Sequence, residues 1–264
     1  MSSNSYASRG SRAFHVAAHT LLETIRDRVF GVSILFSAML LGAALVLSPL
    51  AAGEQDKIIM DLGLAGISVI GLFLALFIGA SLVFREVERR SIYTVLSKPI
   101  ARDEYILGKY CGSVLTIVLN VLMMSVLYVL LVSLHLETFH MGLLSAIYLI
   151  ALELAVIAAF SLFFSVVSSP FMGAFFTLAL FVAGHLARDI LHFAELVPAE
   201  SGRMILKGIT YMLPNLEYFN VKGMAVYGKP IPPDLLLFAT SYGALYIVGV
   251  LLLTMLVFRR KDLQ

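Results

Sequence analysis

Long apolar runs alternate with short polar connections along this chain, and the pattern predicts helices that cross a membrane. A helix needs about 20 apolar residues to span the ~30 Å hydrocarbon core of a bilayer. We expect one helix in each of six windows: 29–50, 62–84, 110–134, 141–169, 170–187 and 235–258. Glu153 is the single Asp, Glu, Lys or Arg in these windows. The predicted fold class is all-α, a polytopic membrane protein with six transmembrane helices.

The polar segments divide the rest of the chain. Residues 1–11 are polar and rich in serine, so we expect a disordered tail followed by a single membrane domain over 12–264. Apolar residues recur at helical spacing between Phe14 and Val29, which predicts an amphipathic interfacial helix or, as the alternative, a cytoplasmic linker helix. Five prolines break the outer loop over 188–234 into short pieces, none of them long enough to span.

Composition agrees with this reading, because 60% of the residues are apolar and 14% are charged, against about 45–50% and about 25% in soluble domains. The net charge of +2 excludes a nucleic-acid binder, which needs a concentrated basic face, and leaves membrane lipids as the expected surroundings. If both termini are cytoplasmic, 13 of the 19 Lys and Arg residues lie on the inner side. This bias predicts cytoplasmic termini.

Glu153 lies near the middle of its window, where an ionised side chain costs at least ~2.5–3.5 kcal/mol. The carboxyl group must therefore be protonated, paired or hydrated. Two hypotheses stay open at this point. Glu153 lines a substrate or proton pathway, or it forms a buried hydrogen bond to a neighbour such as Asn120 of the third window.

Four polar residues at the end of the fifth window are spaced i, i+3, i+4 and i+7, so we expect them to share one helical face: His185, Arg188, Asp189 and His192. Two imidazoles and a carboxylate can hold a metal ion, although the neighbouring arginine disfavours a cation. We interpret this group as a solvated helix end.

A phosphate-binding loop is suggested by GMAVYGKP at residues 223–230, which matches G-x-x-x-x-G-K. Pro230 occupies the position where Ser or Thr would hold magnesium, so we interpret the match as coincidental. We expect no catalytic residue, no metal site and no cofactor in this chain.

Ten of the chain's 19 basic and 17 acidic residues lie between positions 85 and 109. Within this stretch Ile92, Val95 and Leu96 share one helical face, and Pro99 ends the helix. A topology signal would explain the basic residues but not the acidic ones. We therefore predict a short amphipathic docking helix held below the membrane.

The stretch REVERRSIYTVLSKPIARDEYILGK (85–109) resembles the loop between the second and third transmembrane helices of ABC-transporter permeases of the type-2 exporter class. The resemblance is strongest to the branch that includes the permease of the nitrous-oxide-reductase maturation transporter. It rests on the charged run 86–90, the segment 96–100, Arg102 and the Gly108-Lys109 pair. LPNLEYFNV (213–221) is similar to a second family segment, and Ala101 departs from the more usual Ser.

The resemblance implies a six-helix half-transporter in the cell inner membrane that binds two separately encoded ATPase subunits. ATP and Mg²⁺ would bind to those partners. The permease would pair with a second copy of itself or with a different permease. The resemblance assigns ATPase coupling to Glu86, Glu88, Arg89, Arg90, Ile92, Tyr93, Val95, Leu96, Lys98, Pro99 and Arg102.

Two other functional classes remain as alternatives. In an ion- or proton-coupled secondary transporter Glu153 would carry the ion, and residues 85–109 would be only a topology signal. In a membrane scaffold nothing would be transported.

Overall fold

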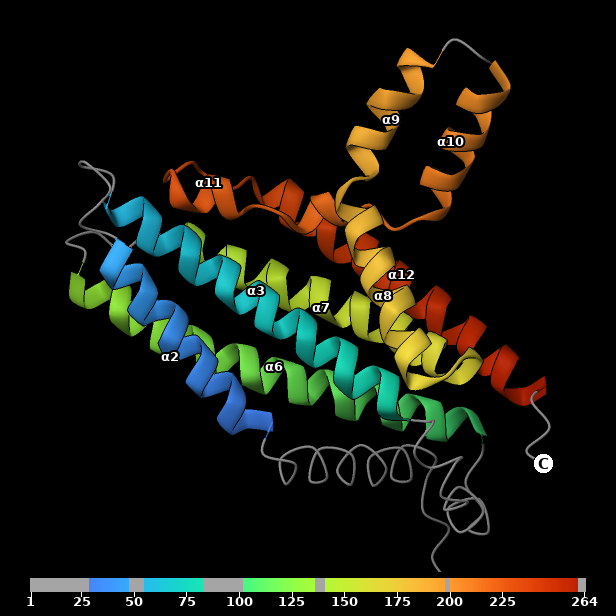
Figure 1. Cartoon of the computed structure of the whole chain (residues 1–264), viewed down its shortest axis with the longest axis horizontal. Coiled ribbons are helices and arrows are strands. Elements are labelled where there is room, and N and C mark those ends of the chain that lie inside the picture. Colours follow the sequence, from blue (N-terminus) through green and yellow to red (C-terminus); the bar gives the residue numbers. More distant parts are fainter. Residues whose placement is uncertain (1–28, 48–54, 83–101, 136–140, 198–199, 261–264) are drawn as a thin grey trace, which may run out of the picture.

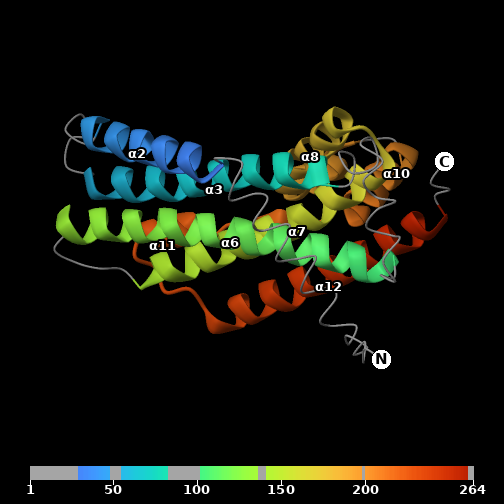
Figure 2. The ribbon, with the colours of Figure 1, turned by 90° about the horizontal axis from the view of Figure 1, so that it is seen from below.

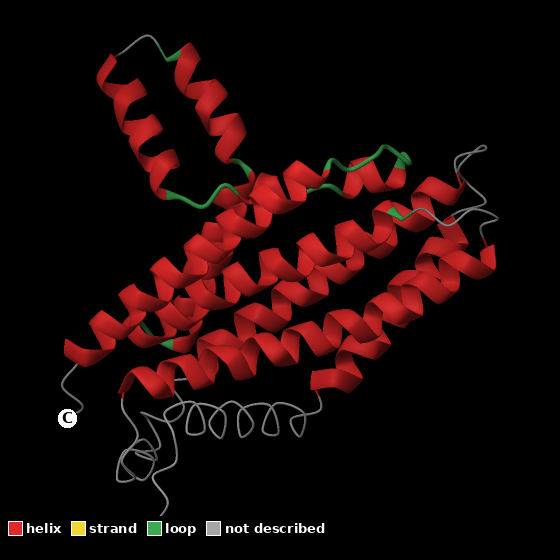
Figure 3. Cartoon of the chain, turned by 180° about the vertical axis from the view of Figure 1, so that it is seen from behind, coloured by secondary structure: helices red, strands yellow, loops and turns green. Residues whose placement is uncertain are grey.

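The computed structural model describes residues 29–47, 55–82, 102–135, 141–197 and 200–260. All regular structure in these ranges is helical, so the all-α prediction is confirmed for them (Figures 1 and 3). The elements in chain order are α2 (Val29–Leu47), α3 (Gln55–Leu82), α6 (Arg102–His135), α7 (Gly142–Val167), α8 (Pro170–His185), α9 (Ala187–Leu196), α10 (Glu200–Met212), the 3-10 helix η2 (Leu216–Phe219), α11 (Lys222–Val226) and α12 (Pro233–Arg260).

In the described part of the chain, four helices are long and apolar enough to cross a membrane: α3, α6, α7 and α12. Helices α8 and α9 count as a fifth span if the bent pair is taken together. The axis bends by 62° between them. The 16 residues of α8 cover about 24 Å, less than the ~30 Å hydrocarbon core. The chain is a multi-pass membrane protein, and the count of six spans stays a prediction.

Helix α7 is the centre of the bundle and packs against α3, α6, α8 and α12 (Figure 2). Seven consecutive residues, Glu153 to Ala159, are buried. Seven residues cover nearly two helical turns, so α7 has no exposed face there. The tightest approach involves Gly71 of α3, where an added Cβ would lie 2.2 Å from Leu154 Cδ1. Small residues of this kind let membrane helices approach closely.

Tyrosine hydroxyls join α6 to its neighbours. Tyr110 donates a hydrogen bond to the carbonyl of Ala155 in α7 over 3.2 Å. Tyr128 donates to the carbonyl of Met60 in α3 over 3.0 Å. Both rings are buried, and burial away from water makes a paired hydroxyl necessary. The two bonds fix the position of α6 against α3 and α7.

Two helices, α3 and α6, begin about two turns earlier than the apolar windows predict. Helix α3 begins at Gln55 rather than 62, and α6 begins at Arg102 rather than 110. The first turn of α3 contains Asp56, and that of α6 contains Asp103 and Glu104. Carboxylates stabilise a helix N-terminus. At 34 residues, α6 is about 51 Å long, which exceeds the ~30 Å hydrocarbon core. The helix is therefore long enough to include the charged residues at its start.

Between α8 and α12 the chain forms short helices. Helices α9 and α10 pack side by side as a hairpin that stands away from the bundle (Figures 1 and 3). The elements η2 and α11 return to the bundle and contact α7. The predicted tail 1–11 and the amphipathic segment before Val29 lie outside the described residues.

Candidate functional site

A carboxylate and an imidazole meet inside the bundle. Glu153 Oε1 of α7 lies 2.8 Å from His185 Nε2 at the end of α8. The Glu153 side chain is 1% exposed and that of His185 is 23% exposed. The edge of the imidazole packs against Phe181, with the ring centroids 4.5 Å apart. The pair provides the partner that an intramembrane carboxyl group requires.

A second carboxylate faces the other side of the imidazole. His185 Nδ1 lies 3.7 Å from Glu217 Oε2, an ion-pair distance rather than a direct hydrogen bond. Glu217 also accepts hydrogen bonds from Asn220 Nδ2 at 3.2 and 3.3 Å. A ring with a hydrogen on both nitrogens can serve both carboxylates. The cluster of Glu153, His185 and Glu217 therefore joins α7, α8 and η2.

The position of Glu217 depends on the loop that precedes it. Asn215 caps η2 by accepting a hydrogen bond from Glu217 N over 3.1 Å. The backbone N–H of Asn215 donates to Tyr242 Oη of α12 over 2.7 Å. Tyr246, one turn further along α12, donates to the carbonyl of Leu213 over 3.4 Å. The LPNLEYFNV segment is thus held against α12 and presents Glu217 to His185.

Gly184 permits this approach. A Cβ at position 184 would lie 2.7 Å from the carbonyl oxygen of Pro214 and 2.7 Å from Leu216 Cγ. Backbone atoms cannot yield as a flexible side chain does, so a larger residue would push the loop away from α8. The close contact lies beside His185 and sets the distance between that ring and η2.

The cluster lies where α8 bends into α9. His185 is the last residue of α8, and Leu186 interrupts the helix with φ −83° and ψ 0°. A hydrogen-bonded pair at such a corner can hold the bend in one arrangement, and loss of the imidazole would leave a buried carboxyl group without this partner. This arrangement can control the geometry of the corner, while its burial keeps Glu153 from direct contact with solvent.

The proposed pairing of Glu153 with Asn120 is wrong. Asn120 Nδ2 donates to the carbonyl of Thr116 in its own helix over 2.9 Å, and its buried Oδ1 has no hydrogen-bond partner among the described residues. The actual partner, His185, is 32 residues away and on another helix. Spacing along a single helix could not identify this partner. A histidine at the end of an apolar window does, however, indicate a side chain that can pair with a buried carboxyl group.

The prediction that His185, Arg188, Asp189 and His192 share one helical face is also wrong. The 62° bend separates the first of them from the other three. His185 turns into the bundle, whereas Asp189 and His192 are exposed on α9. Among the described residues, no group of three or more His, Cys, Asp or Glu side chains could hold a metal ion.

Most residues assigned to ATPase coupling lie outside the described residues. They are Glu86, Glu88, Arg89, Arg90, Ile92, Tyr93, Val95, Leu96, Lys98 and Pro99. Arg102 is the first residue of α6, so the structure places the end of the charged stretch in a helix. Residues 223–230 overlap α11 and include a turn at Gly228, and the element before them is the 3-10 helix η2 rather than the strand that precedes a phosphate-binding loop.

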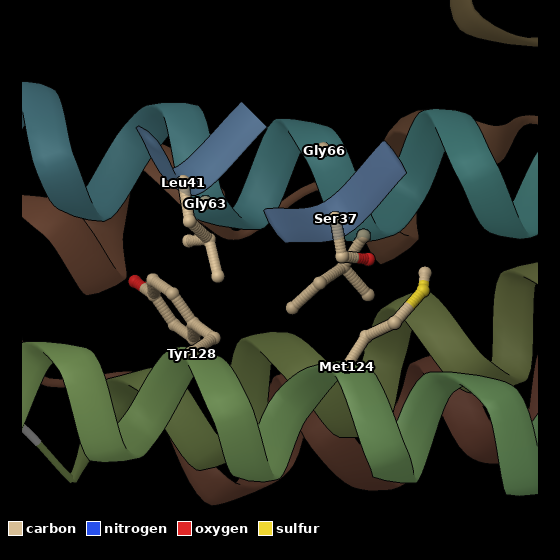
Figure 4. Close-up of a pocket in the computed structure, with 7 residues that line it drawn as sticks. Ser37, Leu41, Gly63, Gly66, Met124 and Tyr128 are labelled. Carbon is tan, nitrogen blue, oxygen red and sulfur yellow. The ribbon is translucent and has the colours of Figure 1, made fainter. Parts of the chain in front are cut away.

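A small cavity of about 10 Å³ lies between α2, α3 and α6 (Figure 4). It is lined by Ser37 and Leu41 of α2, by glycines of α3, and by Met124 and Tyr128 of α6. The hydroxyl of Ser37 is buried, and no group in the described part of the chain forms a hydrogen bond with it. The volume suits one water molecule at most, so this cavity is no chamber for a transported molecule.

Comparison with known proteins identifies the family. Residues 15–263 match the ABC-2 family transporter protein domain, which is nearly the whole chain. None of the curated proteins compared with the chain matches it. The match agrees with the apolar spans and favours an ABC transporter subunit over the secondary-transporter alternative. The chain belongs to the ABC-2 transporter family and is a membrane subunit of an ABC transporter.

Proposed function

We propose that this chain is the permease of a type-2 ABC exporter and works as a dimer with two separately encoded ATPase subunits. The observation that carries the proposal is the family match over residues 15–263. A homodimer would place the transport pathway on the two-fold axis, and a heterodimer with another permease is the alternative. ATP and Mg²⁺ bind to the ATPase partners in this scheme.

Six spans with both termini in the cytoplasm agree with the distribution of basic residues in the sequence, 13 of 19 on that side. In this orientation α2 is the first span and α8 with α9 forms the fifth. The subunit belongs to the cell inner membrane. The branch that includes the nitrous-oxide-reductase maturation permease is supported by residues 85–109 and 213–221.

Coupling to the ATPase takes place at residues 85–109. The apolar face of Ile92, Val95 and Leu96 enters a cleft of the ATPase, and the flanking charges fix the register. Apolar anchors carry most of the affinity of such interfaces, whereas rim charges tune orientation and association rate. Closure of the ATPase dimer then moves the start of α6.

The cluster of Glu153, His185 and Glu217 keeps the α8–α9 corner in one arrangement during this motion. Support comes from the 2.8 Å contact between Glu153 and His185 and from the near-complete burial of Glu153. Movement of η2 would change the contact between Glu217 and His185, while the contact between Glu153 and His185 holds the corner. The cluster acts as a positioning device rather than as a catalytic centre.

The proposal is tested by pulling down the full chain from its native host and identifying bound chains by mass spectrometry. We expect an ATPase with Walker motifs. An Ile92→Asp, Leu96→Asp double variant should lose it and keep the thermal stability of the wild type, since neither residue lies in a predicted span. Lys98→Ala is the matched control and should retain it, because exposed ion pairs are worth under ~1 kcal/mol. Normal ATPase binding by the double variant would refute docking at this stretch.

The isolated permease should hydrolyse no ATP, whereas addition of the ATPase partner should give a rate that the permease alters. ATP turnover by the purified chain, free of contaminating ATPase, would contradict the division of labour between the subunits.

A further inference from the structure

An apolar groove of about 560 Å³ runs between α6 and α7. Its lining extends from Val118 to Ser133 on α6 and from Leu144 to Ala151 on α7, two helices that lie side by side in Figure 2. The floor is buried, with Val121 2% exposed, while Val126 on the rim is 60% exposed. The hollow therefore opens outward from the bundle. Its volume lies within the range of about 300–1,000 Å³ typical of ligand pockets.

The groove follows one half of the membrane. Both helices that line it are apolar spans, so its opening faces hydrocarbon. The stretch from Val118 to Ser133 is about 22 Å long at helical rise. It lies in the half of α6 farther from Asp103. One leaflet contributes about 15 Å to the hydrocarbon core, so the groove is long enough for a chain that runs through a single leaflet.

The hydroxyl groups in the lining are already paired. Ser125 donates to the carbonyl of Val121 over 2.6 Å, and Ser133 donates to the carbonyl of Leu130 over 2.9 Å. Tyr148 Oη lies 2.9 Å from Thr240 Oγ1 of α12. A molecule in the groove therefore meets apolar side chains, because the hydroxyl groups of the lining already have hydrogen-bond partners.

A second copy of the chain is a poor occupant for this shape. A two-fold interface places the same patch on both subunits, so a groove on the axis would face an identical groove. Two facing apolar hollows would leave a space without packing contacts, and the paired hydroxyl groups of the lining would offer a transported molecule few polar contacts there. A flexible, unbranched hydrocarbon chain can fill a narrow hollow without losing packing contacts.

We propose that the α6–α7 groove is a binding site for one acyl chain of a bilayer phospholipid. The chain lies along α6 over the buried floor at Val121 and Ser125, and the headgroup stays at the membrane surface near the end of α6. Exposed apolar positions elsewhere on the spans contact lipid that exchanges freely. The groove holds its lipid longer because α6 and α7 contact the acyl chain from two sides.

The absence of tryptophan from the chain makes a direct test possible. Single-tryptophan variants Val126→Trp, at the groove, and Leu245→Trp, on α12 at 73% exposure, are placed in nanodiscs of phospholipid with brominated acyl chains. Both should be quenched. After mixing with excess unbrominated lipid, fluorescence of Leu245→Trp should recover quickly and that of Val126→Trp several-fold more slowly.

Two results would overturn the proposal. Equal recovery rates would mean that the groove holds lipid no longer than any other surface. Absence of quenching at Val126→Trp from the start would mean that protein, such as a second copy, covers the groove.

Filling the groove gives an independent measurement. Ala151→Leu enlarges a lining residue, while Ala244→Leu makes the same change at an exposed position of α12 outside the groove. Phospholipid retained per purified chain, counted by mass spectrometry, should fall by one for Ala151→Leu and stay unchanged for Ala244→Leu. If Ala151→Leu fails to fold, Leu122→Phe fills the groove from its exposed rim instead. Unchanged retention in a folded groove variant would contradict the assignment.

Discussion

Arg259 in the last turn of α12 makes a two-pronged contact with Asp103 in the first turn of α6. Arg259 Nε donates to Asp103 Oδ1 over 2.9 Å, and Nη2 bonds Oδ2. Beside this pair, Phe258 stacks on Tyr105 with the ring centroids 5.8 Å apart. The first turn of α6, which lies within the charged stretch 85–109, is therefore joined to the end of the last helix.

This junction predicts a route for the motion that the proposed ATPase partner would generate. If residues 85–101 are moved, α6 moves with them, and the Asp103–Arg259 pair carries α12 along. Arg259→Gln should reduce the permease's effect on the ATPase rate of its partner. The melting temperature should stay unchanged, because the arginine side chain is 60% exposed. Arg260→Gln is the matched control at the neighbouring exposed position. Equal coupling in both variants would exclude this route.

A second prediction concerns the pair of Glu153 and His185. His185→Ala should lower the free energy of unfolding by about 3 kcal/mol, because it leaves a buried carboxyl group without its partner. Glu153→Gln should cost less, since an amide can still bond the imidazole. The double variant Glu153→Leu, His185→Ala should recover part of the loss. Thermal unfolding in detergent measures these three variants and the single variant Glu153→Leu. Strictly additive losses for Glu153→Leu and His185→Ala would refute a coupled pair.

The same variants separate a structural role from a role in transport. If Glu153→Leu is as stable and as active as the wild type, the carboxyl group serves neither a pathway nor the α8–α9 corner. Normal stability with lost transport would instead assign Glu153 to the pathway.

Gly184 supplies a third prediction. Gly184→Ala should displace the Pro214 carbonyl and the nearby η2, because the new Cβ would lie 2.7 Å from that oxygen. We expect a lower melting temperature and weaker coupling between Glu217 and His185 in a double-mutant cycle. Gly208→Ala on α10 is the control, since nothing lies within 4 Å of its Cβ. Identical behaviour of the two variants would mean that the loop does not need this close approach.

The fourth prediction tests the packing of α3 against α7. Gly71→Ala should destabilise the bundle by about 1–3 kcal/mol, the usual cost of overpacking, because its Cβ would overlap Leu154. Gly249→Ala in α12 meets nothing within 4 Å and should be neutral or slightly stabilising, since alanine favours helix more than glycine does. Thermal unfolding of both variants decides the matter. Equal melting temperatures would show that α3 and α7 can move apart freely.

The apolar windows alone determined that the chain is helical and enters a membrane. Lipid offers no hydrogen bonds to the backbone, so an apolar run long enough to cross must satisfy its own N–H and C=O groups as a helix. Helices α7 and α12, over Gly142–Val167 and Pro233–Arg260, lie close to the windows 141–169 and 235–258. The resemblance of residues 85–109 to ABC-transporter permeases likewise predicted the family that the match over residues 15–263 shows.

The helix ends and the intramembrane partners were decided by tertiary structure. An apolar window ends at the first charged residue. Helix α6 instead begins at Arg102, before its window, and its first turn is held by the ion pair between Asp103 and Arg259 of α12. Sequence spacing identifies neighbours within one helix, and so it suggested a single face for His185 and Asp189 that the bend at Leu186 breaks. The partner of Glu153 depends on how α7 and α8 pack, and packing between helices follows from close contacts that no linear spacing records.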